Sequence, residues 1–406
     1  MSITSEGPVA LSARALGPDL ARGCMLLFIA LANTHYFLTG TSAGASIRGG
    51  FPLDGSTLDS AVTWVIATVV DGRAFPMFGF LFGYGVAHIV RRQQAAGVAP
   101  RAVRRLLWRR GAVLIGVGVV DGLLFYVGDI LAMYGVLLLV GAFAVRWSDR
   151  WLLVVAGLLF ALNALPAANS SSVSTDPPDV AMLPPDLATQ LAERPAAVAF
   201  IALLGPLGFA CPYLLGLWAG RRRVLEQPER YRGLLVAVAV VGVTVAVLGA
   251  QPVALMLAGV TSVPSPDTLE LIGPLHDATG VLGGLGYAAL ITLVARPLEG
   301  LVEGRRGRVI DALAATGQRS MTCYLLQSVV WAVVFTPYLL GLAGTLTVTA
   351  TALLAIATWV ASVVLADLLA RRGRRGPFEV LVRRVTYRRA APDPARRNPQ
   401  RPGRVT

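Results

Sequence analysis

The sequence predicts an all-α protein, namely a polytopic integral membrane protein with about ten transmembrane helices and with both termini in the cytoplasm. Of its 406 residues, 55% are hydrophobic and only 15% are charged, and the mean hydropathy is +0.64. Soluble proteins carry about 25% charged residues, so these charges are too few to cover a soluble surface. The three cysteines, an odd number spread over the chain, also exclude a disulfide-stabilised secreted fold.

Ten stretches of the sequence approach the pattern of a membrane-spanning helix, which needs roughly 20 mostly apolar residues. Backbone polar groups in lipid must be paired within their own segment, so each stretch is predicted to be helical. The ten stretches lie at about 23–39, 74–90, 110–127, 130–145, 151–165, 197–220, 233–252, 278–295, 319–341 and 346–369.

The 36 basic residues are all arginines, and their positions set the predicted orientation. With the N-terminus inside, 33 arginines fall in the cytoplasm and only Arg48, Arg73 and Arg194 fall outside. The positive-inside rule expects such a bias in short loops. The distribution of the net charge of +13 therefore predicts a multi-pass protein of the cell membrane, and it gives no reason to propose a nucleic acid as partner.

Two stretches do not fit the pattern of simple spans and short loops. Residues 57–70 are apolar but short, and counting them as a span would export the arginine-rich loops. We therefore expect a helix there that lies at, or dips into, the outer face. Residues 166–196 are rich in proline, serine and alanine and are expected to form a flexible outer loop.

The chain divides into a cytoplasmic N-terminal segment (1–18), a transmembrane domain (19–370) and a basic cytoplasmic tail (371–406). The last part of the tail, 390–406, contains four prolines and is expected to be disordered. Its arginines are expected to contact anionic lipid headgroups of the bilayer. No feature of the sequence predicts an oligomeric state.

The first predicted helix carries a histidine, which is unusual in a membrane span. His35 lies about 20 Å beyond Arg22 at 1.5 Å per residue, and so reaches the outer half of the membrane. An ionisable residue there costs roughly 2.5–3.5 kcal/mol and usually faces a cavity or a partner. His35 is therefore a candidate general base, with Asn33 beside it as a candidate substrate-binding residue. Alternatively, His35 is a structural histidine at the helix end.

Two aspartates near the end of the third predicted helix are candidate catalytic residues. Asp121 reaches the outer half of the membrane, and Asp129 lies in the tight turn that follows. A buried carboxylate beside a histidine forms a workable acid–base pair. The alternatives are that Asp121 pairs with an arginine and that Asp129 caps the helix beginning near Ile130.

Arg73 stands out as an outer cation at the start of the second predicted helix. An arginine can bind an anionic group through two parallel hydrogen bonds, which makes Arg73 a candidate substrate-binding residue. Alternatively, it pairs with Asp71 or with a lipid phosphate. Gly79, Gly83 and Gly85 follow within the span, where small residues predict close helix packing rather than a phosphate-binding loop.

A polar stripe runs along the ninth predicted helix, because Ser320, Tyr324, Gln327 and Ser328 recur at helical spacing. Tyr324 and Gln327 are therefore candidate substrate-binding residues, although hydrogen bonding between helices explains such a stripe equally well. The cysteines show no metal-ligand spacing, so we predict no metal site and no bound cofactor.

Five motifs, taken in order, resemble the YeiB-like family of bacterial membrane proteins, the group with domain of unknown function 418 (DUF418). The opening motif LDxxRG…N of that family resembles Leu16, Asp19, Ala21-Arg22-Gly23 and Asn33. Four further family motifs resemble the segments 73–85, 121–134, 317–327 and 376–386. The family pattern has histidine where this chain has Asp121, and lysine where it has Arg73.

The family is in turn distantly similar to transmembrane acyltransferases, which open with a similar motif and carry a histidine in or near the first helices. Those enzymes move an acyl group from cytoplasmic acyl-CoA to a sugar or lipid on the other side. The resemblance implies that Asp19 and Arg22 lie at the cytoplasmic entrance, where Arg22 suits a phosphate. It also implies that His35 deprotonates an acceptor hydroxyl, that Asp121 or Asp129 orients His35, and that acyl-CoA is a co-substrate.

Three functions remain open at this point. The first is an acyltransferase that acts on an envelope glycan or lipid. The second is a proton-coupled transporter of a small molecule or a lipid flippase, in which Asp121 and His35 form a relay and Pro206 with Pro212 break a helix. The third is a membrane scaffold without chemistry.

Overall fold

The computed structural model describes residues 15–38, 47–53, 55–166, 170, 172–176, 178–299, 301 and 305–387. The predictions for residues 1–14 and for the tail 390–406 therefore lie outside the described residues. Helices dominate the described chain. Its β-structure is limited to two antiparallel strands of two residues each, β1 (Ile47–Arg48) and β2 (Phe51–Pro52).

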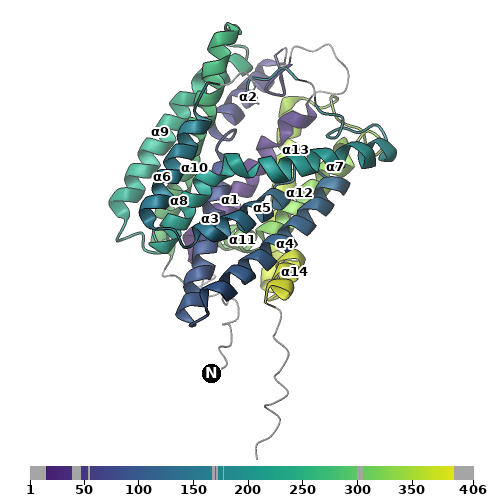
Figure 1. The fold of residues 1–406 in the computed structure, drawn as a ribbon. Coiled ribbons are helices and arrows are strands. Elements are labelled where there is room, and N and C mark those ends of the chain that lie inside the picture. The colour runs from purple at the N-terminus through teal and green to yellow at the C-terminus, as the bar shows by residue number, and fades with distance from the viewer. Residues whose placement is uncertain are drawn as a thin grey trace, which may run out of the picture.

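The helices follow one another along the chain, and the longest connections join η2 to α2 and α6 to α7 (Figure 1). In chain order they are α1 (Leu16–Ala32), η2 (Thr34–Phe37), α2 (Thr57–Val69), α3 (Ala74–Ala95), α4 (Pro100–Leu124), α5 (Leu131–Ala144), α6 (Asp149–Asn163), α7 (Leu187–Leu204), α8 (Pro206–Arg221), α9 (Arg232–Leu257), α10 (Pro266–Ala295), η3 (Arg296–Leu298), α11 (Arg308–Gln318), α12 (Ser320–Phe335), α13 (Val348–Arg371) and α14 (Pro377–Thr386). Each of the ten predicted stretches contains a helix, and α2 occupies the short stretch at 57–70.

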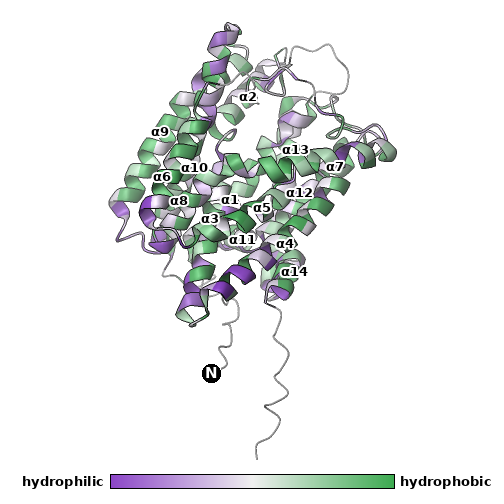
Figure 2. Cartoon of the chain, in the orientation of Figure 1, coloured by the Kyte–Doolittle hydropathy of each residue, from purple (hydrophilic) through white to green (hydrophobic). Residues whose placement is uncertain are grey.

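Among the residues that the structure describes, six helical stretches are long and apolar enough to cross a membrane, judged by length and composition: Leu16–Phe37, Thr57–Ala95, Leu187–Arg221, Arg232–Leu257, Pro266–Leu298 and Val348–Arg371. Large apolar side chains remain exposed on the helices, and Leu158, Phe200 and Leu248 are each 65% exposed. Hydrophobic residues cover the middle of the helices, whereas hydrophilic residues gather at their ends (Figure 2). Such a surface is unfavourable in water and indicates a membrane protein.

The sixth predicted stretch differs from expectation in two ways. Helix α7 begins at Leu187, within the predicted flexible loop 166–196, because the Asp186 side chain caps it by accepting from the Thr189 N–H at 2.7 Å. The helix then ends at Leu204, and α8 starts at Pro206. Proline lacks the N–H that would continue the helical ladder, so the sequence itself breaks this stretch into two helices.

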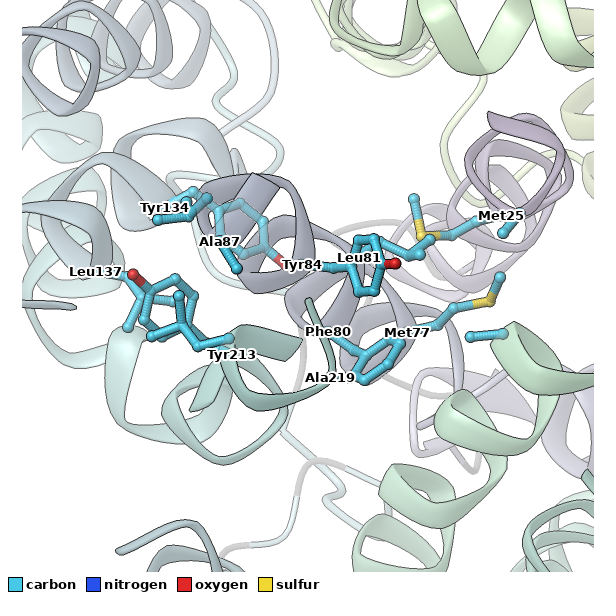
Figure 3. Close-up of a cluster of buried hydrophobic side chains, with 14 of the residues drawn as sticks. Met25, Met77, Phe80, Leu81, Tyr84, Ala87, Tyr134, Leu137, Tyr213 and Ala219 are labelled. Atoms are coloured by element: carbon cyan, nitrogen blue, oxygen red, sulfur yellow. The ribbon is translucent and has the colours of Figure 1, made fainter. Parts of the chain in front are cut away.

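The core joins α1, α3, α5 and α8. Met25 of α1 lies beside Leu81 of α3, and Tyr213 of α8 lies beside Leu137 of α5 (Figure 3). Helices α3 and α8 approach closely, since a Cβ atom at Gly83 would collide with the carbonyl of Tyr213. The interpretation of the second predicted helix as a packing surface is thereby confirmed.

The arginine-rich turns meet at one end of the bundle. Arg221, at the end of α8, donates to the carbonyls of Val145 and Trp147, both at 2.6 Å, in the turn between α5 and α6. Arg91, at the end of α3, donates to the carbonyl of Gly220. Arginines from separate parts of the sequence therefore share one end of the molecule, as the charge asymmetry requires.

The predicted tail contains an ordered helix that composition alone did not reveal. Within α14, Glu379 accepts from the backbone N–H groups of Met321 and Thr322 at 2.9 and 3.1 Å. The Thr322 hydroxyl donates to the same carboxylate at 2.5 Å. Glu379 thus satisfies free N–H groups in the first turn of α12, and this bond fixes α14 against the bundle.

Candidate functional site

A cavity of about 490 Å³ opens at the arginine-rich end. Its walls come from α1, α3, α4, α5, α11, α12, α14 and the connection between α8 and α9. Besides the carboxylates of Asp19, Glu226 and Glu379, one part of the wall is basic and another is apolar. The basic part contains Arg22, Arg92, Arg110, Arg319, Arg375 and Arg383, and the apolar part includes Met25, Phe78, Phe82, Leu114 and Leu131.

Helix α3 shows how these two parts are arranged, because one of its faces lines the cavity from Phe78 to Gln93. Phe78 and Phe82 lie in the interior of the bundle, whereas Arg92 and Gln93 lie at the end of the helix. At 1.5 Å per residue, Phe82 and Arg92 are about 15 Å apart. The cavity therefore has a basic mouth and an apolar depth.

The first helix places two predicted residues in this cavity. Asp19 and Arg22 form an ion pair at 3.1 Å, and Arg22 also donates to the carbonyl of Leu81 at 3.4 Å. Both side chains line the cavity. The structure therefore brings Asp19 and Arg22 together at the polar part of the wall.

Tyr324 connects the cavity to a carboxylate. Its side chain lines the cavity, and its hydroxyl accepts from the backbone N–H of Ile130 at 3.2 Å. The neighbouring Asp129 accepts from the Ala132 N–H at 2.9 Å, in the first turn of α5. The capping role considered for Asp129 is thus confirmed, and its second carboxylate oxygen has no hydrogen-bond partner.

Asp121 lies next to Asp129 and is only 2% exposed. Ser328 of α12 is another polar neighbour, yet neither carboxylate oxygen of Asp121 has a partner in hydrogen-bond geometry. Arg194 is close enough to act electrostatically, but it donates to the carbonyls of Ala181 and Leu123 instead. Two neighbouring carboxyl groups can share one proton, and a buried polar group without partners needs an explanation.

His35 lies apart from the cavity. Its ring is 4.0 Å from the ring of Tyr36 and 5.8 Å from that of Phe51, measured between centroids, and Nδ1 is buried without a hydrogen-bond partner. Asn33 is also buried, at the end of α1. In the described chain, no hydrogen bond or ion pair joins His35 to Asp121. The two segments still approach each other, because the ring centroids of Phe37 and of Tyr126, in the turn after α4, are 6.1 Å apart.

Arg73 and Gln327 hold helices together. Arg73 is fully buried, donates to the Ala246 carbonyl at 2.7 Å and lies 2.8 Å from Nε2 of His276. Gln327 donates to the Leu26 carbonyl at 3.1 Å, which is the hydrogen bond between helices considered for the polar stripe. Neither residue lines the cavity.

A histidine–carboxylate pair at the cavity wall escaped the sequence analysis. Nδ1 of His88 lies 3.2 Å from Oε1 of Glu226, and both side chains line the cavity. Arg91 donates to the same oxygen at 2.5 Å, and Tyr84 donates to it at 3.3 Å. The pair joins α3 to the connection between α8 and α9, a separation of 138 positions that no sequence pattern spans.

Within the described part of the chain, no group of three or more histidine, cysteine, aspartate or glutamate side chains is able to hold a metal ion. Several side chains in and behind the cavity wall can take part in chemistry. They are the guanidinium groups, the His88–Glu226 pair, and Tyr324 with the carboxylates behind it.

The Glu226 carboxylate predicts a pH dependence of stability. Burial raises its pKa, but hydrogen bonds from His88 and Arg91 outweigh burial and hold the pKa below the ordinary value of 4.5. A depressed pKa means that the contribution of Glu226 to stability is complete above pH 4.5 and is lost as the pH falls. We expect thermal unfolding in detergent to separate wild type from Glu226→Gln at pH 7 and much less at pH 3.5. A constant difference would contradict this assignment.

The fold and the site define the class of protein as a helical membrane protein whose cavity opens at an arginine-rich end. A sequence model described as "Protein of unknown function (DUF418)" matches residues 219–389. The uncharacterized protein YxaH of Bacillus subtilis is 26% identical over 400 residues, covering 91% of this chain and 93% of the relative. The uncharacterized protein YeiB of Escherichia coli is 25% identical over 402 residues, covering 92% and 96%. These matches support the resemblance to the YeiB-like DUF418 family that the motifs predicted.

Proposed function

We propose that this protein is a membrane-embedded acyltransferase that takes the acyl group from acyl-CoA and moves it to a sugar or lipid hydroxyl on the other side of the membrane. The observation that carries the proposal is the cavity with a basic mouth and an apolar depth. CoA is a polyanion, and an acyl chain is apolar, so the two parts of the wall match the two parts of this donor.

The proposed orientation follows from the same cavity. Acyl-CoA is a cytoplasmic metabolite, so the arginine-rich end faces the cytoplasm and both termini lie there. The ten predicted helices then cross the cell membrane, with α2 at the outer face and the basic tail on anionic lipid.

The proposed transfer uses the groups beyond the apolar depth. The acceptor hydroxyl gives its proton to the Asp121–Asp129 pair, and its oxygen bonds to the thioester carbonyl carbon. The carbon–sulfur bond breaks, the sulfur takes the proton from the carboxylate pair, and CoA leaves through the basic mouth. Tyr324 lies between the cavity and the carboxylates, whereas His35 and Asn33 stand on the acceptor side. Positioned acid–base groups of this kind contribute about 10²–10⁴-fold to a rate.

Binding of acyl-CoA tests this proposal. We expect the purified protein in detergent to bind palmitoyl-CoA and to bind free CoA more weakly. Arg22→Gln should weaken the binding of both ligands about tenfold or more, because a charge-assisted hydrogen bond contributes about 1.5–3 kcal/mol. The matched control is Arg150→Gln, at the same end of the bundle but outside the cavity wall. Equal affinity in both variants, or no binding by wild type, would contradict the proposal.

A proton-coupled transporter or lipid flippase is the second candidate. It is favoured by two observations, the buried carboxylate pair and the interruption of a long apolar stretch between Leu204 and Pro206. Substrate uptake into proteoliposomes that requires a pH gradient and disappears in Asp121→Asn would favour this candidate over acyl transfer.

A further inference from the structure

We propose that His88 and Glu226 form a catalytic pair that hydrolyses the thioester of acyl-CoA in the cavity, as an activity separate from transfer to the far side. The inference rests on the proposed function, because it concerns the same cavity and the same donor. It assigns chemistry to a histidine that the transfer reaction does not use.

The hydrogen bonds define which nitrogen of His88 is reactive. Nδ1 of His88 lies 3.2 Å from Oε1 of Glu226 and 3.3 Å from Nη2 of Arg91. Arg91 donates to Glu226 at the shorter distance of 2.5 Å, and a carboxylate only accepts hydrogen bonds, so we assign the imidazole proton to Nδ1. Nε2 then carries a lone pair, and no hydrogen bond in the described part of the chain uses it. Arg91 at 2.5 Å and Tyr84 at 3.3 Å hold the carboxylate in turn. The arrangement is that of a histidine base oriented by an acid.

The exposure of the pair allows water to reach it. The side chain of His88 is 34% exposed and that of Glu226 is 20% exposed. Both belong to the wall of the open cavity. By contrast, the Asp121–Asp129 pair is almost fully buried. Water is therefore the nucleophile that suits His88.

The position of His88 along α3 coincides with the expected position of a thioester. At 1.5 Å per residue, His88 lies about 9 Å from Phe82 of the apolar depth and about 6 Å from Arg92 of the mouth. In acyl-CoA the thioester links the phosphate-bearing part to the acyl chain. Phosphates at the arginines and a chain against Phe82 place the thioester between them, at the level of His88, whereas transfer requires the thioester to move deeper, towards Tyr324 and the carboxylates behind it.

The reaction balances without a further reagent. Nε2 of His88 takes a proton from water while the water oxygen bonds to the thioester carbonyl carbon. The carbon–sulfur bond breaks, and the sulfur receives the proton from Nε2. The products are a fatty acid and free CoA, and the imidazole returns to its starting state. Glu226 is a positioning residue, since it holds the tautomer of His88.

The experiment uses the full-length protein in detergent with palmitoyl-CoA and no acceptor, and it measures free CoA and palmitate by chromatography. We expect wild type to release both products at equal rates. His88→Ala should lower kcat about 100-fold or more while KM stays within about twofold, and added imidazole should restore part of the rate. Glu226→Gln should lower kcat without changing KM. Gln94→Ala, an exposed position on the same helix outside the cavity wall, is the control.

The outcomes separate this inference from the proposed function. If wild type binds palmitoyl-CoA but releases no CoA, or if His88→Ala hydrolyses it at the wild-type rate, the inference is wrong and the transfer proposal stands. His88→Ala could instead lose activity through a raised KM, with no recovery when imidazole is added. That result would show a structural role for His88 and would also overturn the inference. If wild type fails to bind palmitoyl-CoA, both proposals fail.

Discussion

Replacing Asp121 by asparagine is expected to abolish acyl transfer while leaving the protein at least as stable as wild type. The side chain is 2% exposed, lies beside Asp129, and has no hydrogen-bond partner for either oxygen. Asparagine has the same shape as aspartate, but its amide carries neither the negative charge of the carboxylate nor the acidic proton of the carboxylic acid. A buried group that is poorly satisfied contributes little to stability, so the presence of Asp121 needs an explanation other than stability.

We expect the rate of transfer to fall about 10²–10⁴-fold in Asp121→Asn, which is the usual contribution of a general base. The measurements are transfer to an acceptor lipid in liposomes and the midpoint of thermal unfolding in detergent. Asp186→Asn is the control, because this aspartate is an exposed helix cap outside the cavity wall. If Asp121→Asn kept more than a third of the activity, the carboxylate pair would have no role in proton transfer.

Replacing Gly317 by leucine is expected to have the largest effect on structure. Helices α1 and α11 cross so closely that a Cβ atom at Gly317 would collide with the backbone carbonyl of Asp19. A second contact of the same kind joins Gly23 to the carbonyl of Leu313. Because the obstacle is backbone rather than a flexible side chain, the helices must separate. Overpacking of this kind costs about 1–3 kcal/mol.

The same substitution should also weaken acyl-CoA binding, because Asp19 forms the ion pair with Arg22 in the cavity wall. Thermal unfolding and palmitoyl-CoA binding in detergent measure the two effects. Gly157→Leu is the matched control, since a Cβ atom at Gly157 of α6 meets nothing within 4 Å. A Gly317→Leu variant as stable as this control would disprove the close crossing of the two helices.

The helices were predictable from the sequence because hydropathy is a local property. Each predicted apolar stretch contains a helix, and proline marks the break at Pro206. Proline is not sufficient for a break, because Pro195 and Pro212 lie inside continuous helices, so the expected break at Pro212 is wrong. The capping role of Asp129 was predictable for the same reason, since the N–H that it accepts lies three residues away. Helix α14 was missed because its anchor, Glu379, bonds to residues nearly sixty positions earlier.

The composition of the site was less predictable, because it depends on contacts between distant segments. The sequence predicts Arg73 to be a binding residue, yet in the structure it packs beside His276, which lies 203 positions away. Gln327 likewise bonds to α1 rather than facing the cavity. Among the nine candidate site residues, Asp19, Arg22 and Tyr324 line the cavity, and the Asp121–Asp129 pair lies behind Tyr324. The His88–Glu226 pair needed the fold to become visible.

The first and the last described elements share the cavity wall, since Ala15 and Asp19 line it together with Arg383 and Tyr387. This has a consequence for biosynthesis. A ribosome that has delivered every apolar helix to the membrane has still not delivered α14, so the nascent chain is inserted before its cavity is complete. The molecule acquires a complete cavity wall only after α14 has been synthesised. A chain that ends prematurely after α13 keeps its place in the bilayer but lacks one wall of the cavity.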